Sequence, residues 1–171
     1  MWAKIMIQLL GRSQIEDNWD LYKDQLKVAF TSSEGALIEV GNNFEKAIKV
    51  IRYKLLSDRP TMHLWVECKD LYAGRQGAID YIVLTLLAQC EFTKRKTLVL
   101  VTITKTGDTP KEKLSERYFN AYQAVSKFAK EEGCEGMTCY SDLEYFADMA
   151  KETKHYTNVR TRYMFYFPLK D

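Results

Sequence analysis

The run from Thr97 to Thr104 (TLVLVTIT) constrains the fold more than any other stretch of the chain. It is rich in β-branched and large apolar residues, which suit the interior of a sheet. A strand of this composition is typical of one that is covered on both faces. It therefore needs a sheet around it and helices over that sheet, and we expect an α/β fold with this strand at its centre.

Other segments alternate between strand and helix patterns. Strands are expected at residues 2–10, 36–40, 62–68, 137–140 and 162–167. Helices are expected at residues 13–30, 41–56, 78–90 and 110–133, with a last helix that begins at Ser141. Ser13 and Glu16 have the spacing of a capping box, and Gly133 is a typical helix stop. This order predicts a central mixed sheet that is flanked by helices on both faces.

Length and composition predict one domain. With 171 residues, 46% of them hydrophobic and 13% aromatic, the chain can bury a sizeable core. The net charge of +2 excludes the global positive field of a strongly basic nucleic-acid-binding protein. Any site for a polyanion must therefore be local, and Lys94, Arg95 and Lys96 form the best candidate. The same cluster also fits solvated loop charges.

The cysteines and the longest apolar run point to a reducing compartment. Cys68, Cys90, Cys134 and Cys139 are scattered, and no Cys-x-x-Cys motif is present. No basic segment followed by an apolar stretch opens the chain, and the run from Ile79 to Cys90 is interrupted by polar residues. We therefore expect a cytoplasmic protein with free thiols and no membrane partner.

One strand end carries two charged residues that suggest chemistry. In the segment Trp65 to Asp70, the side chains of Glu67 and Lys69 are expected to share one face of the strand. Two charges beside an apolar strand are costly unless they are paired, solvated or bound to a metal. A carboxylate that holds Mg²⁺ and an ammonium group that positions water suit phosphodiester hydrolysis. An ion pair in solvent explains the same residues.

This arrangement resembles the PD-(D/E)xK nucleases, which have the restriction-endonuclease-like fold. Glu67-Cys68-Lys69 matches the E-x-K motif, and Glu45 matches the acidic position of the family's first helix. The resemblance implies a nuclease-like core at residues 41–150, between an N-terminal strand and helix at 1–40 and a C-terminal strand at 151–171. Lys69, Glu67 and Glu45 would then be catalytic.

The resemblance also implies a cofactor and a partner. Glu67 would hold Mg²⁺ or Mn²⁺ together with Asp58 or Glu39, although neither of the last two has the family's usual position in the chain. DNA or RNA would be the substrate, and Arg75 and Gln76 would face its phosphates beside the basic cluster at residues 94–96. The implied function is a metal-dependent nuclease or a nuclease-derived nucleic-acid-binding domain.

Two alternatives remain open at this stage. His63 and His155 could serve as acid and base in a metal-independent two-histidine phosphoesterase, although Trp65 replaces the hydroxyl residue expected after His63. The near-neutral charge and many aromatic residues also fit a non-catalytic α/β interaction module. Such a module would be a homo-oligomer or a subunit that binds a protein partner.

Overall fold

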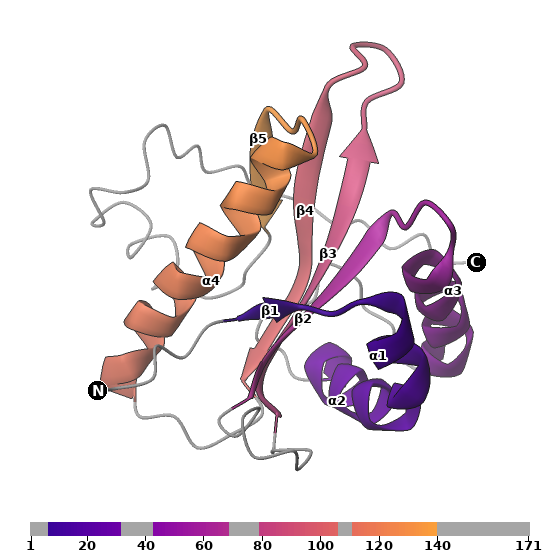
Figure 1. Ribbon diagram of the computed structural model, residues 1–171, viewed down its shortest axis with the longest axis vertical. Helices are drawn as coiled ribbons and strands as arrows, with labels where there is room; N and C mark the ends of the chain where they lie inside the picture. The colour runs from indigo at the N-terminus through magenta and orange to yellow at the C-terminus, as the bar shows by residue number, and fades with distance from the viewer. Residues whose placement is uncertain (1–6, 32–42, 69–78, 106–110, 140–171) are drawn as a thin grey trace, which may run out of the picture.

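The computed structural model describes residues 7–31, 43–68, 79–105 and 111–139. In these ranges a five-stranded sheet separates two helical layers, as Figure 1 shows. The strands are β1 (Gln8–Leu9), β2 (Met62–Cys68), β3 (Ile79–Gln89), β4 (Lys96–Lys105) and β5 (Gly136–Cys139). The helices are α1 (Arg12–Asp17), α2 (Trp19–Thr31), α3 (Phe44–Leu56) and α4 (Lys111–Glu131). The α/β class and the helices on both faces are thus as predicted.

Strands β1 to β5 lie in the sheet in the order of the sequence. Strands β1 to β4 are antiparallel, and β5 then pairs with β4 in parallel. A parallel neighbour requires a crossover connection, and α4 provides it. The sheet is therefore a meander that ends in one β-α-β unit.

The side chains of each strand alternate between two cores. On β2, Leu64 and Val66 pack with α1, α2 and α3, whereas Trp65 packs toward α4. The ring of Phe128 on α4 meets Trp65 edge to face at a centroid distance of 5.3 Å. The indole N–H of Trp65 donates a hydrogen bond to the hydroxyl of Thr85 at 3.1 Å, which satisfies two polar groups inside the core.

His63 contributes to the same α4-facing core. Its ring packs edge-on against Phe128 at 4.6 Å, and its buried Nδ1 has no hydrogen-bond partner among the described residues. Burial lowers the pKa of His63, and the nearby charge of Glu132 opposes that shift. The folded chain therefore favours the neutral imidazole.

The largest difference from the sequence prediction is the segment at residues 78–90. We expected a helix there, but residues Ile79–Gln89 form β3. Ile82 and Leu84 pack into one core while Tyr81 and Val83 pack into the other, so the strand is apolar on both faces. A short continuous apolar run has no periodicity that separates a buried strand from a buried helix.

This correction also changes the topology. The next described element after the strand with Glu67 is an antiparallel strand, at the place where a restriction-endonuclease-like core requires the helix predicted for residues 78–90. The centre of the sheet is β3, while β4 lies next to it. The restriction-endonuclease-like core is therefore not present in this arrangement.

Several local predictions are confirmed. Strand β2 has the predicted bounds, β4 extends the predicted strand by one residue at each end, and Gly133 ends the α4 segment with φ 74°. Cys90, Cys134 and Cys139 are free thiols. The strands at 36–40 and 162–167 and the helix from Ser141 lie outside the described residues. Within the ranges described, no helix has the length and hydropathy that crossing a bilayer requires.

Replacing Leu84 with Ala tests the importance of β3. Leu84 has no exposed surface, so the truncation should leave a cavity and lower the free energy of unfolding by about 2–5 kcal/mol in urea denaturation. Phe92→Ala is the control, because Phe92 is 95% exposed. The control should change stability by less than about 0.5 kcal/mol. Equal effects of the two substitutions would contradict the placement of β3.

His63 should make stability depend on pH. Because its pKa in the folded chain lies below the ordinary value of 6.5, protonation costs free energy only in the folded state. The stability present above pH 6.5 should therefore be lost as the pH falls through the lowered folded pKa. Thermal unfolding from pH 8 to pH 4.5, on roughly half-unit steps, should show a smaller loss for His63→Gln than for the wild type. Parallel pH profiles would show that His63 does not contribute.

Candidate functional site

The candidate site is built from the β-α-β unit formed by β4, α4 and β5. Residues Thr97–Leu100 of β4 pair with Gly136–Cys139 of β5. Strand β4 then continues to Lys105, where its described partner is β3 alone. Ligands of open α/β sheets bind beyond the carboxyl ends of parallel strands, and the N-terminus of the crossover helix attracts anions there. The carboxyl half of β4 and the start of α4 therefore form the candidate site.

A β-bulge lies where the described β4–β5 pairing ends. Leu84 is opposite Thr102, and the next residue, Thr85, is opposite Leu100, so Val101 is the extra residue of β4. A bulge leaves backbone groups outside the regular ladder and re-aims the neighbouring side chains. The bulge therefore lies directly after the last residue of β4 that pairs with β5 among the described residues.

Three polar side chains are buried in the described chain: Glu67, Thr85 and Thr102. The partners of Thr85 are the indole of Trp65 and the carbonyl oxygen of His63. The hydroxyl of Thr102 has no hydrogen-bond partner among the described residues, although it directly follows the bulge. A buried hydroxyl of this kind is uncommon in a core that serves only packing.

Glu67 lies inside the protein, with 3% of its surface exposed. It stands opposite Tyr81 in the sheet, and the ring of Tyr81 meets that of Tyr118 on α4 at 5.7 Å. Glu67 therefore faces α4, near the end of the sheet where β4 finishes. The side chain of Glu67 is therefore not in solvent, as the ion-pair alternative expected, while its expected partner Lys69 lies outside the described residues.

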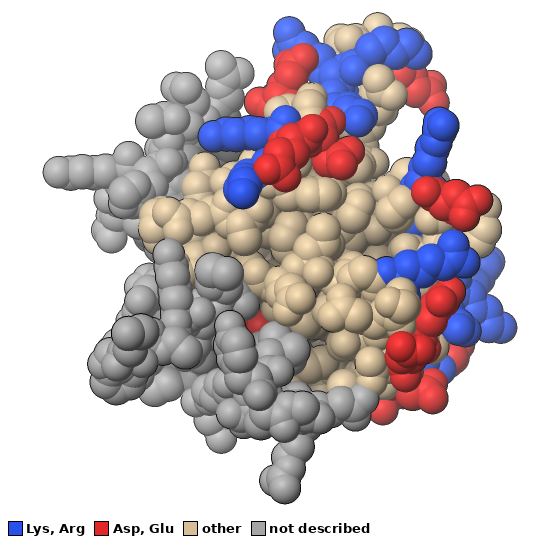
Figure 2. Space-filling view, viewed as in Figure 1, with Lys and Arg blue, Asp and Glu red and all other residues tan. Residues whose placement is uncertain are grey.

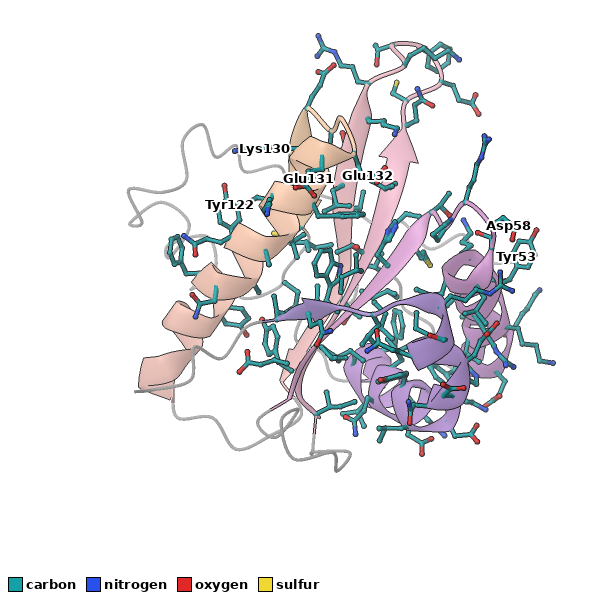
Figure 3. All side chains as sticks on the ribbon, viewed as in Figure 1. Tyr53, Asp58, Tyr122, Lys130, Glu131 and Glu132 are labelled. Carbon is teal, nitrogen blue, oxygen red and sulfur yellow. The ribbon has the colours of Figure 1, made fainter. Side chains whose placement is uncertain are left out.

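The other predicted metal ligands do not join Glu67. Asp58 is fully exposed beyond the end of α3, where it contacts Arg12 at 3.4 Å (Figure 3). Glu45 is in the first turn of α3, at the other end of this 13-residue helix, and pairs with Lys23 at 3.1 Å. Asp58 comes before β2, and Glu67 is the last residue but one of that strand, about 16 Å beyond its start. The described carboxylates therefore point to different sides of the molecule.

The predicted basic cluster closes the β3–β4 hairpin onto the end of α4. The ammonium group of Lys96 donates a hydrogen bond to the carbonyl oxygen of Glu132 at 3.0 Å. Arg95 pairs with Glu135 at 3.3 Å, and Lys94 adopts φ 58° in the turn. A cation near the last carbonyls of a helix is stabilising, so Lys96 and Arg95 have structural partners.

The remaining predicted site residues cannot be placed. Glu39, Lys69, Arg75, Gln76 and His155 lie outside the described residues. In the ranges that are described, no three His, Cys, Asp or Glu side chains come together as a metal site requires. Sequence reasoning also missed Val101 and Thr102, since both belong to an ordinary strand pattern and no residue type marks a bulge.

Comparisons with known proteins identify the fold. The sequence matches no protein-family model, and no curated protein is significantly similar to it. Solved structures do match over nearly the whole chain. A GNAT family acetyltransferase from Staphylococcus aureus has 14% identity and a TM-score of 0.56, with 98% of this chain and 100% of that chain covered.

Two further structures agree. Glucosamine-6-phosphate N-acetyltransferase from Arabidopsis thaliana has 12% identity and a TM-score of 0.53, covering 97% of this chain and 100% of its own. AAC(6')-Iy, solved in complex with the bisubstrate analogue CoA-S-monomethyl-acetylneamine, has 10% identity and a TM-score of 0.56, with 97% of this chain and 99% of that chain covered. At these identities the likeness establishes the fold alone.

These neighbours overturn the nuclease hypothesis. The resemblance to PD-(D/E)xK enzymes was wrong, because a strand-helix-strand order was assumed around Glu67 where the chain has a β-meander. The predictions of Mg²⁺ or Mn²⁺ as cofactor and of DNA or RNA as partner are therefore wrong as well. The same holds for hydrolysis, whether by a metal or by His63 and His155. The chain has the fold of the GNAT acetyltransferases.

Proposed function

We propose that the protein transfers an acyl group from an acyl-coenzyme A thioester to an amine. The observation that carries the proposal is the bulge at Val101, which lies where the described β4–β5 pairing ends. Solved acetyltransferases share this fold, and one of them holds a bisubstrate analogue that joins CoA to an amine. The bulge in β4 of this chain supports the same function from its own geometry.

The sheet edge supports binding of the thioester arm. Among the described residues, the part of β4 from Val101 to Lys105 has no strand partner on the side away from β3, and a bound chain with amide groups would pair there in the way that an added strand does. Helix α4 follows β4 directly in the sequence and has 21 residues. Its N-terminal N–H groups and dipole favour the phosphates of CoA. The thioester would then lie along β4, between the phosphate end and the bulge.

The bulge supports the chemical step. In acyl transfer, the amine nitrogen attacks the thioester carbonyl carbon and the carbonyl oxygen becomes an oxyanion. When the C–S bond breaks, the CoA thiolate leaves and takes up a proton, while the amine gives up one. A backbone N–H outside the regular ladder at the Val101 bulge would be a preorganised donor for the oxyanion.

The amine needs a proton acceptor, and Glu67 is our candidate. Strand β4 supplies none upstream of the bulge, because residues 97–101 are Thr-Leu-Val-Leu-Val. Glu67 is the buried carboxylate of the described chain and lies at the end of the sheet where β4 finishes. Tyr81 stands between it and Lys105 of β4, so the two strand spacings amount to about 10 Å.

The proposal predicts that the purified protein binds acetyl-CoA. Calorimetric titration should give a dissociation constant between about 1 μM and 1 mM, the range usual for enzyme substrates. Incubation with acetyl-CoA and a panel of amines, namely hexosamines, aminoglycosides and lysine peptides, should release CoA thiol and acetylate at least one amine. Acetyl-CoA that neither binds nor reacts at millimolar concentration would contradict the proposal.

Glu67→Gln should reduce turnover without weakening the binding of acetyl-CoA. Loss of a general base lowers kcat by about 10²- to 10⁴-fold, whereas the thioester arm contacts β4 and not Glu67. Glu135→Gln is the matched control, since Glu135 is an exposed carboxylate that pairs with Arg95. The melting temperature of each variant separates a catalytic loss from unfolding. A folded Glu67→Gln variant with normal turnover would remove Glu67 from the mechanism.

A further inference from the structure

Thr85 of β3 lies beside the β4 bulge and makes two hydrogen bonds to the strand on its other side. Its hydroxyl accepts the indole N–H of Trp65 at 3.1 Å and donates to the carbonyl oxygen of His63 at 3.4 Å, both on β2. An indole N–H only donates and a carbonyl oxygen only accepts, so a hydroxyl between them can join the two. The hydroxyl of Thr85 is therefore bound to β2, and not to the backbone of β4.

The row of paired residues through Thr85 is the last one before the bulge. It crosses four strands, and its members are His63, Thr85, Leu100 and Cys139. The next residue of β4 is Val101, the extra residue of the bulge. Because a bulge adds one residue to one strand only, the pairs on either side of it set its place. Thr85 belongs to one of these two pairs.

Burial alone fixes the place of the bulge poorly. Val101 packs into the core under α1 to α3, whereas Leu100 packs toward α4. If the bulge moved by one pair, Val101 would stand opposite Thr85 and would share its face toward α4. An apolar residue of β4 is covered on either face, so both arrangements bury it. A hydrogen bond separates them better, because it holds Thr85 in one direction relative to β2.

Helix α4 covers this hydrogen-bond network. The ring of Phe128 meets Trp65 at 5.3 Å and His63 at 4.6 Å, both edge-on, and Thr85 is fully buried. In Figure 2 the charged groups lie mainly near the β3–β4 hairpin and the adjoining end of α4 and along α1 to α3, with uncharged groups between them. Loss of one partner from a network shielded in this way leaves the other unsatisfied inside the core.

We propose that Thr85 is a positioning residue for the candidate site. Its hydrogen bonds to β2 hold β3 in the register that leaves Val101 as the bulge, and so they aim the backbone donor for the oxyanion. This role rests on the proposed acyl transfer. Thr85 does not touch the thioester or the amine and acts through β4. Because the oxyanion forms only in the transition state, loss of the hydroxyl should lower kcat far more than it weakens acetyl-CoA binding.

Thr85→Val tests this role, because it keeps the shape of the side chain and removes its hydroxyl. Its kcat should fall about tenfold, less than the roughly 10²- to 10³-fold cost of removing an oxyanion donor, because the donor is displaced and not deleted. The Kd of acetyl-CoA should change by less than about twofold. Thr85→Ser keeps the hydroxyl and should restore kcat. Trp65→Phe should lower kcat as well, and adding Thr85→Val to it should cost little more, since both remove the same hydrogen bond.

The backbone amide signals of Val101 and Thr102 in ¹H–¹⁵N NMR spectra report on the bulge without any need for activity. They should move or double in Thr85→Val and return in Thr85→Ser. Leu87→Ala is the matched control, because Leu87 lies on the same face of β3, opposite Leu98, and its apolar side chain makes no hydrogen bond. The control should lower the melting temperature but leave kcat and the two amide signals unchanged.

Two results would overturn the proposal. One is a folded Thr85→Val variant with wild-type kcat and unchanged Val101 signals, and the other is an equal loss of kcat in Thr85→Val and Leu87→Ala. If Thr85→Val does not fold, the same readings on Trp65→Phe decide. A wild type that transfers no acyl group contradicts the proposed function instead, and the Val101 signals then still show whether Thr85 fixes the bulge.

Discussion

Burial of β3 on both faces is the constraint on which the rest of the structure depends. Ile82 and Leu84 fill one core and Tyr81 and Val83 the other, so both helical layers are needed to cover one strand. This requirement fixes α1, α2 and α3 on one face and α4 on the opposite face (Figure 1). Strands β2 and β4 pair with β3 and continue the same alternation. The sheet is therefore a rigid partition on which a site can be built.

The candidate site arises where this regular pattern is broken. Val101 is inserted into β4 as a bulge, and the described pairing with β5 ends at Leu100. Because α4 connects these two strands, its N-terminus follows the part of β4 that has no β5 partner among the described residues. Backbone donors, a helix N-terminus and the buried Glu67 thus belong to the same end of the sheet. This combination suits a thioester that carries phosphate groups better than a phosphodiester bound to a metal.

Local patterns in the sequence predicted many of the helices and strands, but few of the residues that form the candidate site. The bounds of β2, the course of β4 and the stop at Gly133 follow from residue types over a few positions. The predicted metal site is wrong because Asp58 and Glu67, although near in sequence, are separated by most of the length of β2. Glu67 itself was recognised as unusual, since a charge in an apolar strand is costly unless the fold uses it. A three-residue motif does not show whether its side chains are buried, so the burial of Glu67 was not predicted.

By itself, the sequence determined the α/β class, a sheet covered on both faces and the position of most helix and strand ends. These features depend on side-chain polarity and backbone preference within a few residues. Only the tertiary structure decided that residues 79–89 form a strand, that Val101 is a bulge and that Glu67 faces α4. Each of these depends on a partner distant in the chain, because register and burial are properties of pairs of strands and layers.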